Sequence, residues 1–333
     1  MKNAVTDAPS GFQSTLVSAT DFHYIDIIET KLAETLEDSR GVIRKICYHI
    51  LKAGGKRVRP LLVCYSGMLF GEATEELFQA AVAVELIHMA SLIHDDIIDE
   101  TDVRRNQPAV QTLWGVQRAV LGGDYLFAKA FRILADQRLV EPLEVMAKAV
   151  QTMCQGEIEQ DHDQFQLFTD IDRYYSRITQ KTASLMEASC RIGALVNHAL
   201  PEDIETISCF GLHLGLAYQI IDDILDFCGD EAHMGKPKYT DLIKGDLTLP
   251  LLLLLESSPE HEWLKERLQE KPFDRALLPV IETAICQSGI LKEIYHITAN
   301  HLDMARQCLR RFPVSQERRA LEELTDKLQA RVN

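Results

Sequence analysis

Apolar residues recur at every third or fourth position along most of this 333-residue chain, and this spacing constrains its fold more than any other feature. Five long segments are apolar over more than one stripe: Leu77 to His94, Gly123 to Ala135, Val145 to Glu159, Tyr174 to Val196 and Ile204 to Asp226. Helices with more than one apolar face belong at the centre of a bundle. The sequence therefore predicts an all-α protein.

Turn-forming residues mark the expected ends of these helices. They stand at Gly54-Gly55, Gly71, Asn106 to Pro108, Gly122-Gly123, Pro201 and Gly235 to Pro237. None of these stretches resembles a linker between domains. We expect a flexible segment over residues 1–20 and a single all-helical domain over residues 21–333.

Charge and cysteine usage narrow the class of protein. Fifty acidic residues against 35 basic ones give a net charge of −15, which argues against a general nucleic-acid binder. The eight cysteines form no Cys-x-x-Cys pair, and several stand in apolar helical segments, as expected of buried thiols in a reducing compartment. The first twenty residues lack the apolar stretch of a secretory signal, and Leu249 to Leu255 is too short to cross a bilayer. We therefore expect a cytoplasmic protein.

The pattern Asp-Asp-x-x-Asp occurs twice, each time at the end of a long apolar segment. The first motif comprises Asp95, Asp96 and Asp99, and the second comprises Asp222, Asp223 and Asp226. Residues four apart share a helix face, so each motif places like charges side by side, which costs stability. Mg²⁺ bound jointly by carboxylates and substrate phosphates would offset this cost. One such motif is typical of a solvated helix end, but two after apolar helices favour a metal site.

Cationic residues gather beside these acids. Lys56, Arg57 and Arg59 follow a glycine turn, and Arg104-Arg105 follows the first acidic motif. Arginine offers a planar fork to phosphate oxygens, and lysine offers a point charge. Such a cluster alone is typical of a solvated turn. Beside two metal-type motifs, it favours a diphosphate held by Mg²⁺ and by side-chain cations.

Seven ordered motifs are similar to those of a known family. They are GGKRVRP at 54–60, ELIHMASLIHDDIIDETDVRR at 85–105, GDYLFAKA at 123–130, QGEIEQ at 155–160, KTASL at 181–185, YQIIDDILDF at 218–227 and GKPKYTDL at 235–242. With these motifs the chain resembles the trans-isoprenyl diphosphate synthases, the polyprenyl synthetase family. Within the family it is most similar to the catalytic larger subunits, or component II, of heptaprenyl diphosphate synthases.

The resemblance implies an antiparallel helix bundle around a deep central cavity, with the two acidic motifs facing each other across its mouth. It also implies three Mg²⁺ ions, bound by Asp95, Asp99 and Asp222 with the other three aspartates in support. These ions would draw charge from the diphosphate of an allylic substrate as its C1–O bond breaks. The double bond of isopentenyl diphosphate then attacks the allylic cation, and loss of a proton leaves a longer chain.

The resemblance assigns further site residues one at a time. Ligands of isopentenyl diphosphate would be Lys56, Arg59, His88 and Arg105, and ligands of the allylic diphosphate would be Arg104 and Lys181. Gln219 and Thr182 match polar groups near the reacting carbons, and Lys236 matches a lysine that closes over the leaving group. Without the resemblance, His88 is typical of a core histidine. His94 is interpreted as a structural residue at a helix end.

Two positions depart from the family pattern. Asp246 stands where many relatives carry lysine, arginine or asparagine, so a phosphate contact is expected to be missing unless Lys244 replaces it. Tyr218 stands where phenylalanine is usual, and its hydroxyl needs a partner if it is buried.

The length of the product is inferred from the helix that ends in the first acidic motif. The face that carries Asp95 also carries Ser91, Ile87 and Val84, with Ala90 alongside. In the family, a bulky aromatic residue just before the first aspartate forms a floor that stops chain growth, whereas Ala90 and Ser91 are small. We expect a hexaprenyl to decaprenyl product, with heptaprenyl favoured. The alternative is that these small residues serve a tight helix crossing.

Other functions remain open at this point. They are a short-chain farnesyl or geranylgeranyl diphosphate synthase, a terpene cyclase and a non-catalytic partner subunit of a heteromeric synthase. A cyclase does not need the second cationic pocket, silent subunits typically lose acidic motifs, and a di-iron bundle would need Glu-x-x-His pairs.

The resemblance also bears on partners. It implies farnesyl diphosphate as the primer and a homodimer or a heteromer with a smaller subunit. The product would serve the side chain of a quinone such as menaquinone, with at most transient membrane contact. Residues 256–333 are interpreted as scaffold.

Overall fold

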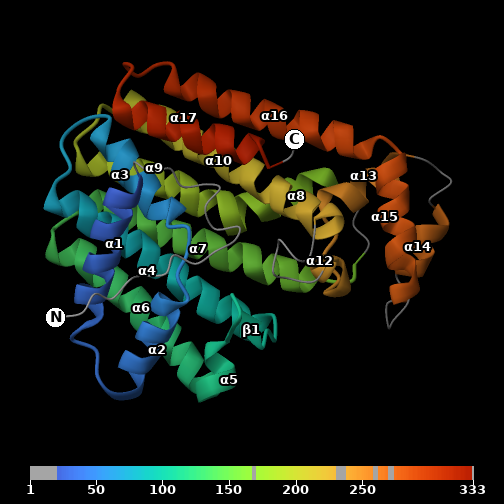
Figure 1. Cartoon of the computed structure of the whole chain (residues 1–333), viewed down its shortest axis with the longest axis horizontal. Coiled ribbons are helices and arrows are strands. Elements are labelled where there is room, and N and C mark those ends of the chain that lie inside the picture. The colour runs from blue at the N-terminus through green and yellow to red at the C-terminus, as the bar shows by residue number, and fades with distance from the viewer. Residues whose placement is uncertain (1–20, 167–169, 230–237, 258–261, 269–273, 332–333) are drawn as a thin grey trace, which may run out of the picture.

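Helices make up almost all of the fold, as the apolar spacing predicts. The computed structural model describes residues 21–166, 170–229, 238–257, 262–268 and 274–331. The N-terminal segment 1–20 lies outside these described residues, as does the turn expected at Gly235 to Pro237. Within the described part the chain forms helices and one short hairpin (Figure 1), which confirms the all-α prediction.

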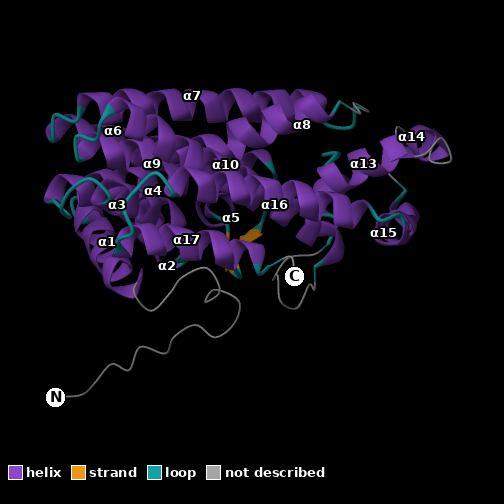
Figure 2. Cartoon of the chain, turned by 90° about the horizontal axis from the view of Figure 1, so that it is seen from above, coloured by secondary structure: helices purple, strands orange, loops and turns teal. Residues whose placement is uncertain are grey.

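The elements follow one another in this order. The first part of the chain forms α1 (Asp21–Leu36), α2 (Gly41–Lys52), α3 (Val58–Met68), α4 (Glu75–Ile98), β1 (Val103–Arg104), β2 (Gln107–Pro108), α5 (Val110–Trp114), α6 (Val116–Asp136) and α7 (Val140–Asp163). The second part forms α8 (Ile171–Ile178), α9 (Ser184–Val196), α10 (Pro201–Cys228), α12 (Thr240–Ile243), α13 (Leu249–Ser257), α14 (Glu262–Leu268), α15 (Leu278–Gln287), α16 (Ile290–Leu309) and α17 (Gln316–Gln329). Figure 2 shows α7 at one side of the bundle and α17 at the opposite side.

The two longest apolar helices carry the acidic motifs at their C-terminal ends. Thr74 caps α4 by accepting a hydrogen bond from Leu77 N, and Pro201 stands in the first turn of α10. Both helices have the length and apolarity that a membrane span would need, but 72% and 61% of their most apolar windows lie buried inside the protein. Because most of each apolar window is covered by other helices of the bundle, α4 and α10 are core helices.

The helix break expected at Gly122-Gly123 is wrong, because α6 runs through both glycines. A Cβ atom at Gly123 would lie 2.2 Å from His94 Nε2, and one at Gly122 would lie 3.0 Å from Ile46 Cγ2. The glycines therefore allow α6 to approach α4 and α2 closely.

The segment Tyr174 to Val196, expected as one helix, contains a wider turn. A π-helical turn over Thr179–Ala183 separates α8 from α9 and carries Lys181 and Thr182. Such insertions are frequent at functional sites.

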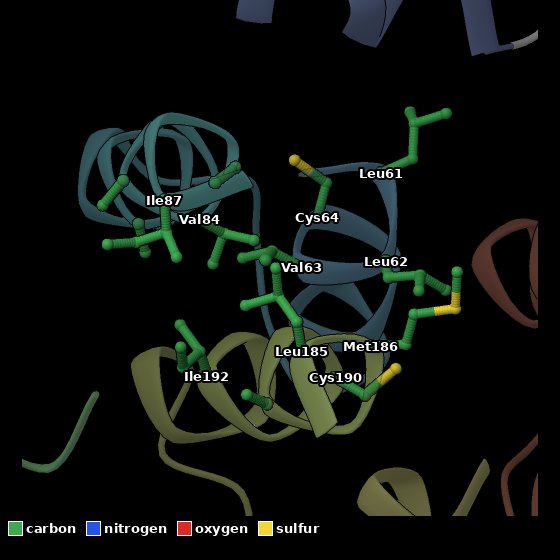
Figure 3. Close-up of a cluster of buried hydrophobic side chains, with 14 of the residues drawn as sticks. Leu61, Leu62, Val63, Cys64, Val84, Ile87, Leu185, Met186, Cys190 and Ile192 are labelled. Atoms are coloured by element: carbon green, nitrogen blue, oxygen red, sulfur yellow. The ribbon is translucent and has the colours of Figure 1, made fainter. Parts of the chain in front are cut away.

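Two hydrophobic clusters form the core, and α10 joins them. Leu214, Ala217 and Ile221 belong to the larger cluster, whereas Ile220 and Ile224 belong to the smaller one against α8, α13, α15 and α16. Figure 3 shows part of the larger cluster between α3, α4 and α9. Burial of thiols is found for three of the eight cysteines, which are Cys47, Cys64 and Cys190, whereas Cys154 and Cys286 are exposed.

Candidate active site

Both acidic motifs contribute to one cavity of about 180 Å³. Asp99, which directly follows α4, and Asp223 of α10 line it. The other lining residues are Gln160, Arg177, Ile178, Lys181, Thr182, Gln219, Asp241, Lys244, Asp246 and Thr248. The cavity thus combines carboxylates from two distant parts of the sequence with three cationic side chains.

Each aspartate of the first motif has a different environment. Burial, with a smaller effect of Glu157, raises the pKa of Asp95 to about 7. Asp96 is 1% exposed, and its Oδ1 accepts a hydrogen bond from Arg104 Nε at 2.6 Å. Asp99 Oδ2 lies 3.0 Å from Lys244 Nζ. Burial therefore raises the pKa values of Asp95 and Asp96, and Asp96 and Asp99 are members of ion pairs.

The second motif divides its roles in a similar way. Asp223 accepts hydrogen bonds from Tyr174 Oη at 2.7 Å and from Gln219 Nε2 at 2.9 Å, and burial raises its pKa to about 7. Asp226 is fully buried and accepts hydrogen bonds from the backbone amides of Thr240 and Asp241. Asp226 therefore holds the start of α12 against the end of α10.

Two polar residues predicted near the reacting carbons lie in one hydrogen-bond chain. Thr182 Oγ1 donates to Gln219 Oε1 at 2.7 Å, and Gln219 Nε2 donates to Asp223. The chain fixes which end of the Gln219 amide faces the second motif.

Cationic side chains predicted to bind isopentenyl diphosphate gather beside the motifs. Arg59 Nη1 lies 3.3 Å from His88 Nε2, and a Cβ atom at Gly55 would lie 3.0 Å from Arg105 Nη1. Burial, together with the positive charges of the neighbouring Arg331 and Arg105, lowers the pKa of Lys56 to about 8. This excess of positive charge would be offset by a bound anion.

The pKa of Arg59 is affected by aspartates of both acidic motifs. Burial lowers the pKa of Arg59, whereas Tyr218, Glu85, Asp222 and Asp95 raise it. Because Asp222 and Asp95 act on the same guanidinium, the cationic group lies within electrostatic reach of the last turns of both α4 and α10.

Arg57, in the same basic stretch, has a structural role. It is 3% exposed, its Nε donates to Glu29 at 2.7 Å, and its Nη1 donates to Glu85 at 2.6 Å. These ion pairs join the α2–α3 turn to α1 and α4.

A two-residue hairpin positions the arginines that follow the first motif. In it Val103 pairs with Pro108 and Arg104 with Gln107. Arg105 and Asn106 at the tip have φ of 51° and 60°, the left-handed conformation that such turns require. The turn expected at Asn106 to Pro108 therefore lies at Arg105 and Asn106, and Gln107 and Pro108 form β2.

Three further expectations concern single residues. Lys236 lies outside the described residues. His94 faces α6, with Nε2 at 3.2 Å from Val120 O and 3.6 Å from Asp124 Oδ1, as a structural residue at a helix end would. The negative charge of Asp222 raises the pKa of Tyr218 to about 12.

Sequence reasoning did not assign several residues that the structure brings to the site. Tyr174, which donates to Asp223, lies in none of the seven motifs. Gln160, which accepts from Lys181, ends the QGEIEQ stretch, but that stretch gave it no role. Arg331 belongs to the segment interpreted as scaffold, yet its charge acts on Lys56 and Tyr218.

The residues predicted to set product length line the interior of the bundle. Val84, Ile87 and Ala90 are fully buried, and Ser91 is 9% exposed. Figure 3 shows Val84 and Ile87 on the side of α4 that faces α3 and α9. The helix face below Asp95 is therefore apolar interior.

The donor set suits a hard cation that also contacts phosphate. Among the described residues no group of three His, Cys, Asp or Glu side chains forms a ready-made metal cage. Mg²⁺ is usually held by one or two carboxylates, waters and substrate phosphates, so it does not need such a cage. The raised pKa values of Asp95 and Asp223 indicate carboxylates that a cation would stabilise in their charged form.

Comparisons with known proteins agree with this geometry. A model of the family "Polyprenyl synthetase" matches residues 40–283. Heptaprenyl diphosphate synthase component 2 from Geobacillus stearothermophilus is 36% identical over 297 residues, covering 89% of this chain and 92% of the relative. A polyprenyl synthase from Caulobacter crescentus, crystallised with calcium and isoprenyl diphosphate, has 32% identity and a TM-score of 0.88, covering 97% of this chain and 99% of that one. A geranylgeranyl pyrophosphate synthetase from Pyrococcus horikoshii has 32% identity and a TM-score of 0.86, covering 96% of this chain and 98% of that one.

Proposed function

The chain belongs to the polyprenyl synthetase family and is a prenyltransferase, and from this premise we propose that it is a long-chain all-trans-polyprenyl diphosphate synthase. The reaction is head-to-tail condensation of isopentenyl diphosphate onto an allylic diphosphate, with farnesyl diphosphate as primer and heptaprenyl diphosphate as product. The observation that carries the proposal is the single cavity lined by Asp99, Asp223 and the cations Lys181 and Lys244.

The carboxylates and cations divide the work between two diphosphates. Asp95, Asp99 and Asp222 would hold Mg²⁺, which when bound supplies positive charge to the departing diphosphate. Lys181 adds a side-chain cation to the allylic headgroup, as Arg104 would after exchanging its contact with Asp96. No side-chain nucleophile is needed, because the substrate's own double bond attacks.

The second cationic group would hold isopentenyl diphosphate. Lys56, Arg59 and Arg105 supply the charge, and His88 beside Arg59 can complete the pocket. Thr182 and Gln219 present fixed dipoles near the second motif, where they would ease a developing carbocation.

Small buried residues support a long product. Ala90 and Ser91 leave no bulky floor under Asp95, and Val84 and Ile87 continue the apolar face. Geranylgeranyl synthases match the chain nearly as well as the heptaprenyl synthase component does, so a short-chain product is the second candidate.

We further propose that the chain works in the cytoplasm as a homodimer or with a smaller subunit, and that its product serves a quinone such as menaquinone. Exposed apolar residues on neighbouring helices support a partner: Leu113 of α5 and Val116, Val120 and Leu121 of α6.

One incubation tests the proposal. The purified chain is mixed with farnesyl diphosphate, labelled isopentenyl diphosphate and Mg²⁺, and the products are separated by chain length. Heptaprenyl diphosphate is expected, with no elongation when EDTA replaces Mg²⁺. A geranylgeranyl product supports the short-chain candidate, and a cyclic product contradicts the proposal. A chain that is inactive alone but elongates when a smaller subunit is added supports the heteromer.

A further inference from the structure

Asp246 is an unexpected carboxylate in a cavity proposed to receive a diphosphate. It follows Gly245 in the loop between α12 and α13, is 7% exposed and lines the same cavity as both acidic motifs. Its backbone N–H donates to Asp241 O at 2.9 Å. Gly245 has φ of +89°, and a Cβ atom there would lie 2.7 Å from the ring of Phe165. The loop is therefore held in place on both sides, and Asp246 has little freedom to turn away.

A hydrogen-bond chain connects Asp246 to a predicted phosphate ligand. Gln160 Nε2 donates to Asp246 Oδ2 at 2.6 Å, and Lys181 Nζ donates to Gln160 Oε1 at 2.6 Å. An amide has a donor end and an acceptor end, and an ionised carboxylate only accepts. Asp246 therefore fixes the Gln160 amide with its oxygen toward Lys181.

Lys181 also contacts a second acceptor on α7, the helix that carries Gln160. Its Nζ lies 2.6 Å from Glu157 Oε2, and Glu157 and Gln160 are three residues apart on one face of α7. The lysine itself sits on the π-helical turn, where a Cβ atom at Gly156 would lie 3.1 Å from Lys181 Cγ. Its stem is packed and its ammonium has two fixed acceptors.

We propose that Asp246 is a positioning residue for the allylic diphosphate: through Gln160 it holds Lys181 Nζ at the cavity, in place of a direct phosphate contact from position 246. The inference rests on the proposed function and deepens it. It also accounts for an acid at this position, because a lysine there would compete with Lys181 for the single acceptor of the Gln160 amide.

Four variants test the hydrogen-bond chain from Asp246 through Gln160 to Lys181. D246N keeps an acceptor and removes the charge, so KM for the allylic diphosphate should stay within about twofold of wild type. D246L removes the acceptor and should raise this KM about tenfold, with the KM for isopentenyl diphosphate unchanged. D246K should raise it as much, because two ammonium groups then face one amide. The double variant D246K/Q160E should return it to within about threefold, because a carboxylate accepts from both lysines.

Thermal unfolding without substrate gives an independent measurement. Q160E alone places two carboxylates in hydrogen-bond contact and should lower the unfolding temperature, and adding D246K should restore it. Three results would each overturn the inference: a lower allylic KM in D246K alone, an allylic KM in D246N raised as much as in D246L, or no recovery of the double variant in either measurement. If wild type elongates and D246L keeps its allylic KM, this inference fails while the proposed function stands. If wild type does not elongate farnesyl diphosphate with or without a smaller subunit, both fail.

Discussion

The role of an aspartate in this protein depends on its contacts as well as on its motif. Asp226 has the same motif position as Asp99, yet two backbone amides occupy its oxygens and make it a structural link to α12. Asp99 faces the cavity beside Lys244. A motif identifies the candidate ligands, but only the fold separates those that face a substrate from those that hold a loop.

Replacing Asp95 by asparagine should remove activity without unfolding the protein. Its carboxylate is predicted to hold Mg²⁺, and the loss of one preset charge at a reaction centre costs about a hundredfold in rate or more. Asp136→Asn is the control, because Asp136 is 66% exposed and, among the described residues, pairs with Arg132 one turn away on α6. The measurement is the rate of isopentenyl incorporation at saturating Mg²⁺. A loss below about threefold in the Asp95 variant would exclude it as a ligand.

The same variant should be more stable than wild type when no metal is present. The pKa of Asp95 is about 7 in the fold, above its ordinary value of 3.8, so the folded state binds more protons between these two pH values. The contribution of Asp95 to stability is then greatest at low pH and is lost as the pH rises toward 7, and Asp223 acts in the same direction. In EDTA at pH 8, Asp95→Asn should raise the unfolding free energy by about 1–3 kcal/mol. Denaturant unfolding at pH 5 and pH 8 measures this, and an equal or larger gain at pH 5 would contradict it.

At the scale of single residues, the sequence predicted what its motifs encode. The six aspartates, Lys181, Thr182 and Gln219 could be proposed as site residues because they stand in stretches that resemble the family's motifs. Tyr174 and Asp246 acquire their contacts from α8 and the α12–α13 loop, which meet α10 and α7 only after folding. Those long-range contacts have no local signal.

At the scale of helices, the glycine pair in α6 led to a wrong prediction of a helix end. Gly122-Gly123 was expected to end a helix, because glycine lowers helix propensity by about 1 kcal/mol. In α6 the missing side chains instead allow contact with His94 and Ile46. Propensity is local and packing is not, so four of the five long segments were predicted as continuous helices, while their close contacts were not predicted. The π-helical turn before α9 was missed for the same reason.

Gly123→Ala should destabilise the protein more than Gly122→Ala does. The first Cβ would lie 2.2 Å from the ring of His94, so either this ring must move or α4 and α6 must separate, at a cost of about 1–3 kcal/mol beyond the propensity gained. The second would lie 3.0 Å from Ile46 Cγ2, a less severe contact, and is the matched control. Thermal unfolding compares the two variants. Equal unfolding temperatures would mean that the α4–α6 contact tolerates a methyl group at either position.

In the molecule as a whole, the packing of α4 and α10 builds both the cavity that carries the acidic motifs and the apolar interior beneath it. The ends of α4 and α10 bring the acidic motifs to a shared cavity, and the bodies of the same helices build the apolar interior beneath it. All-α architecture followed from apolar spacing alone. The meeting of the two motifs followed from the resemblance, because the spacing of one helix does not determine where another one ends.

Product length tests this coupling between packing and chemistry. Ala90 lies fully buried on α4 one turn before the first motif, so phenylalanine there should close the space below Asp95 and stop the chain at farnesyl or geranylgeranyl diphosphate. Because a large side chain in a packed core costs about 1–3 kcal/mol, Ser91→Phe is made alongside, and both variants are checked by thermal unfolding. Gln79→Phe is the control, since Gln79 lies on the same helix at an exposed hydrogen bond with Glu75. Chromatography of the labelled products gives the chain length. If both folded variants make the wild-type product, the growing chain does not run along this face of α4, and the small residues serve helix packing alone.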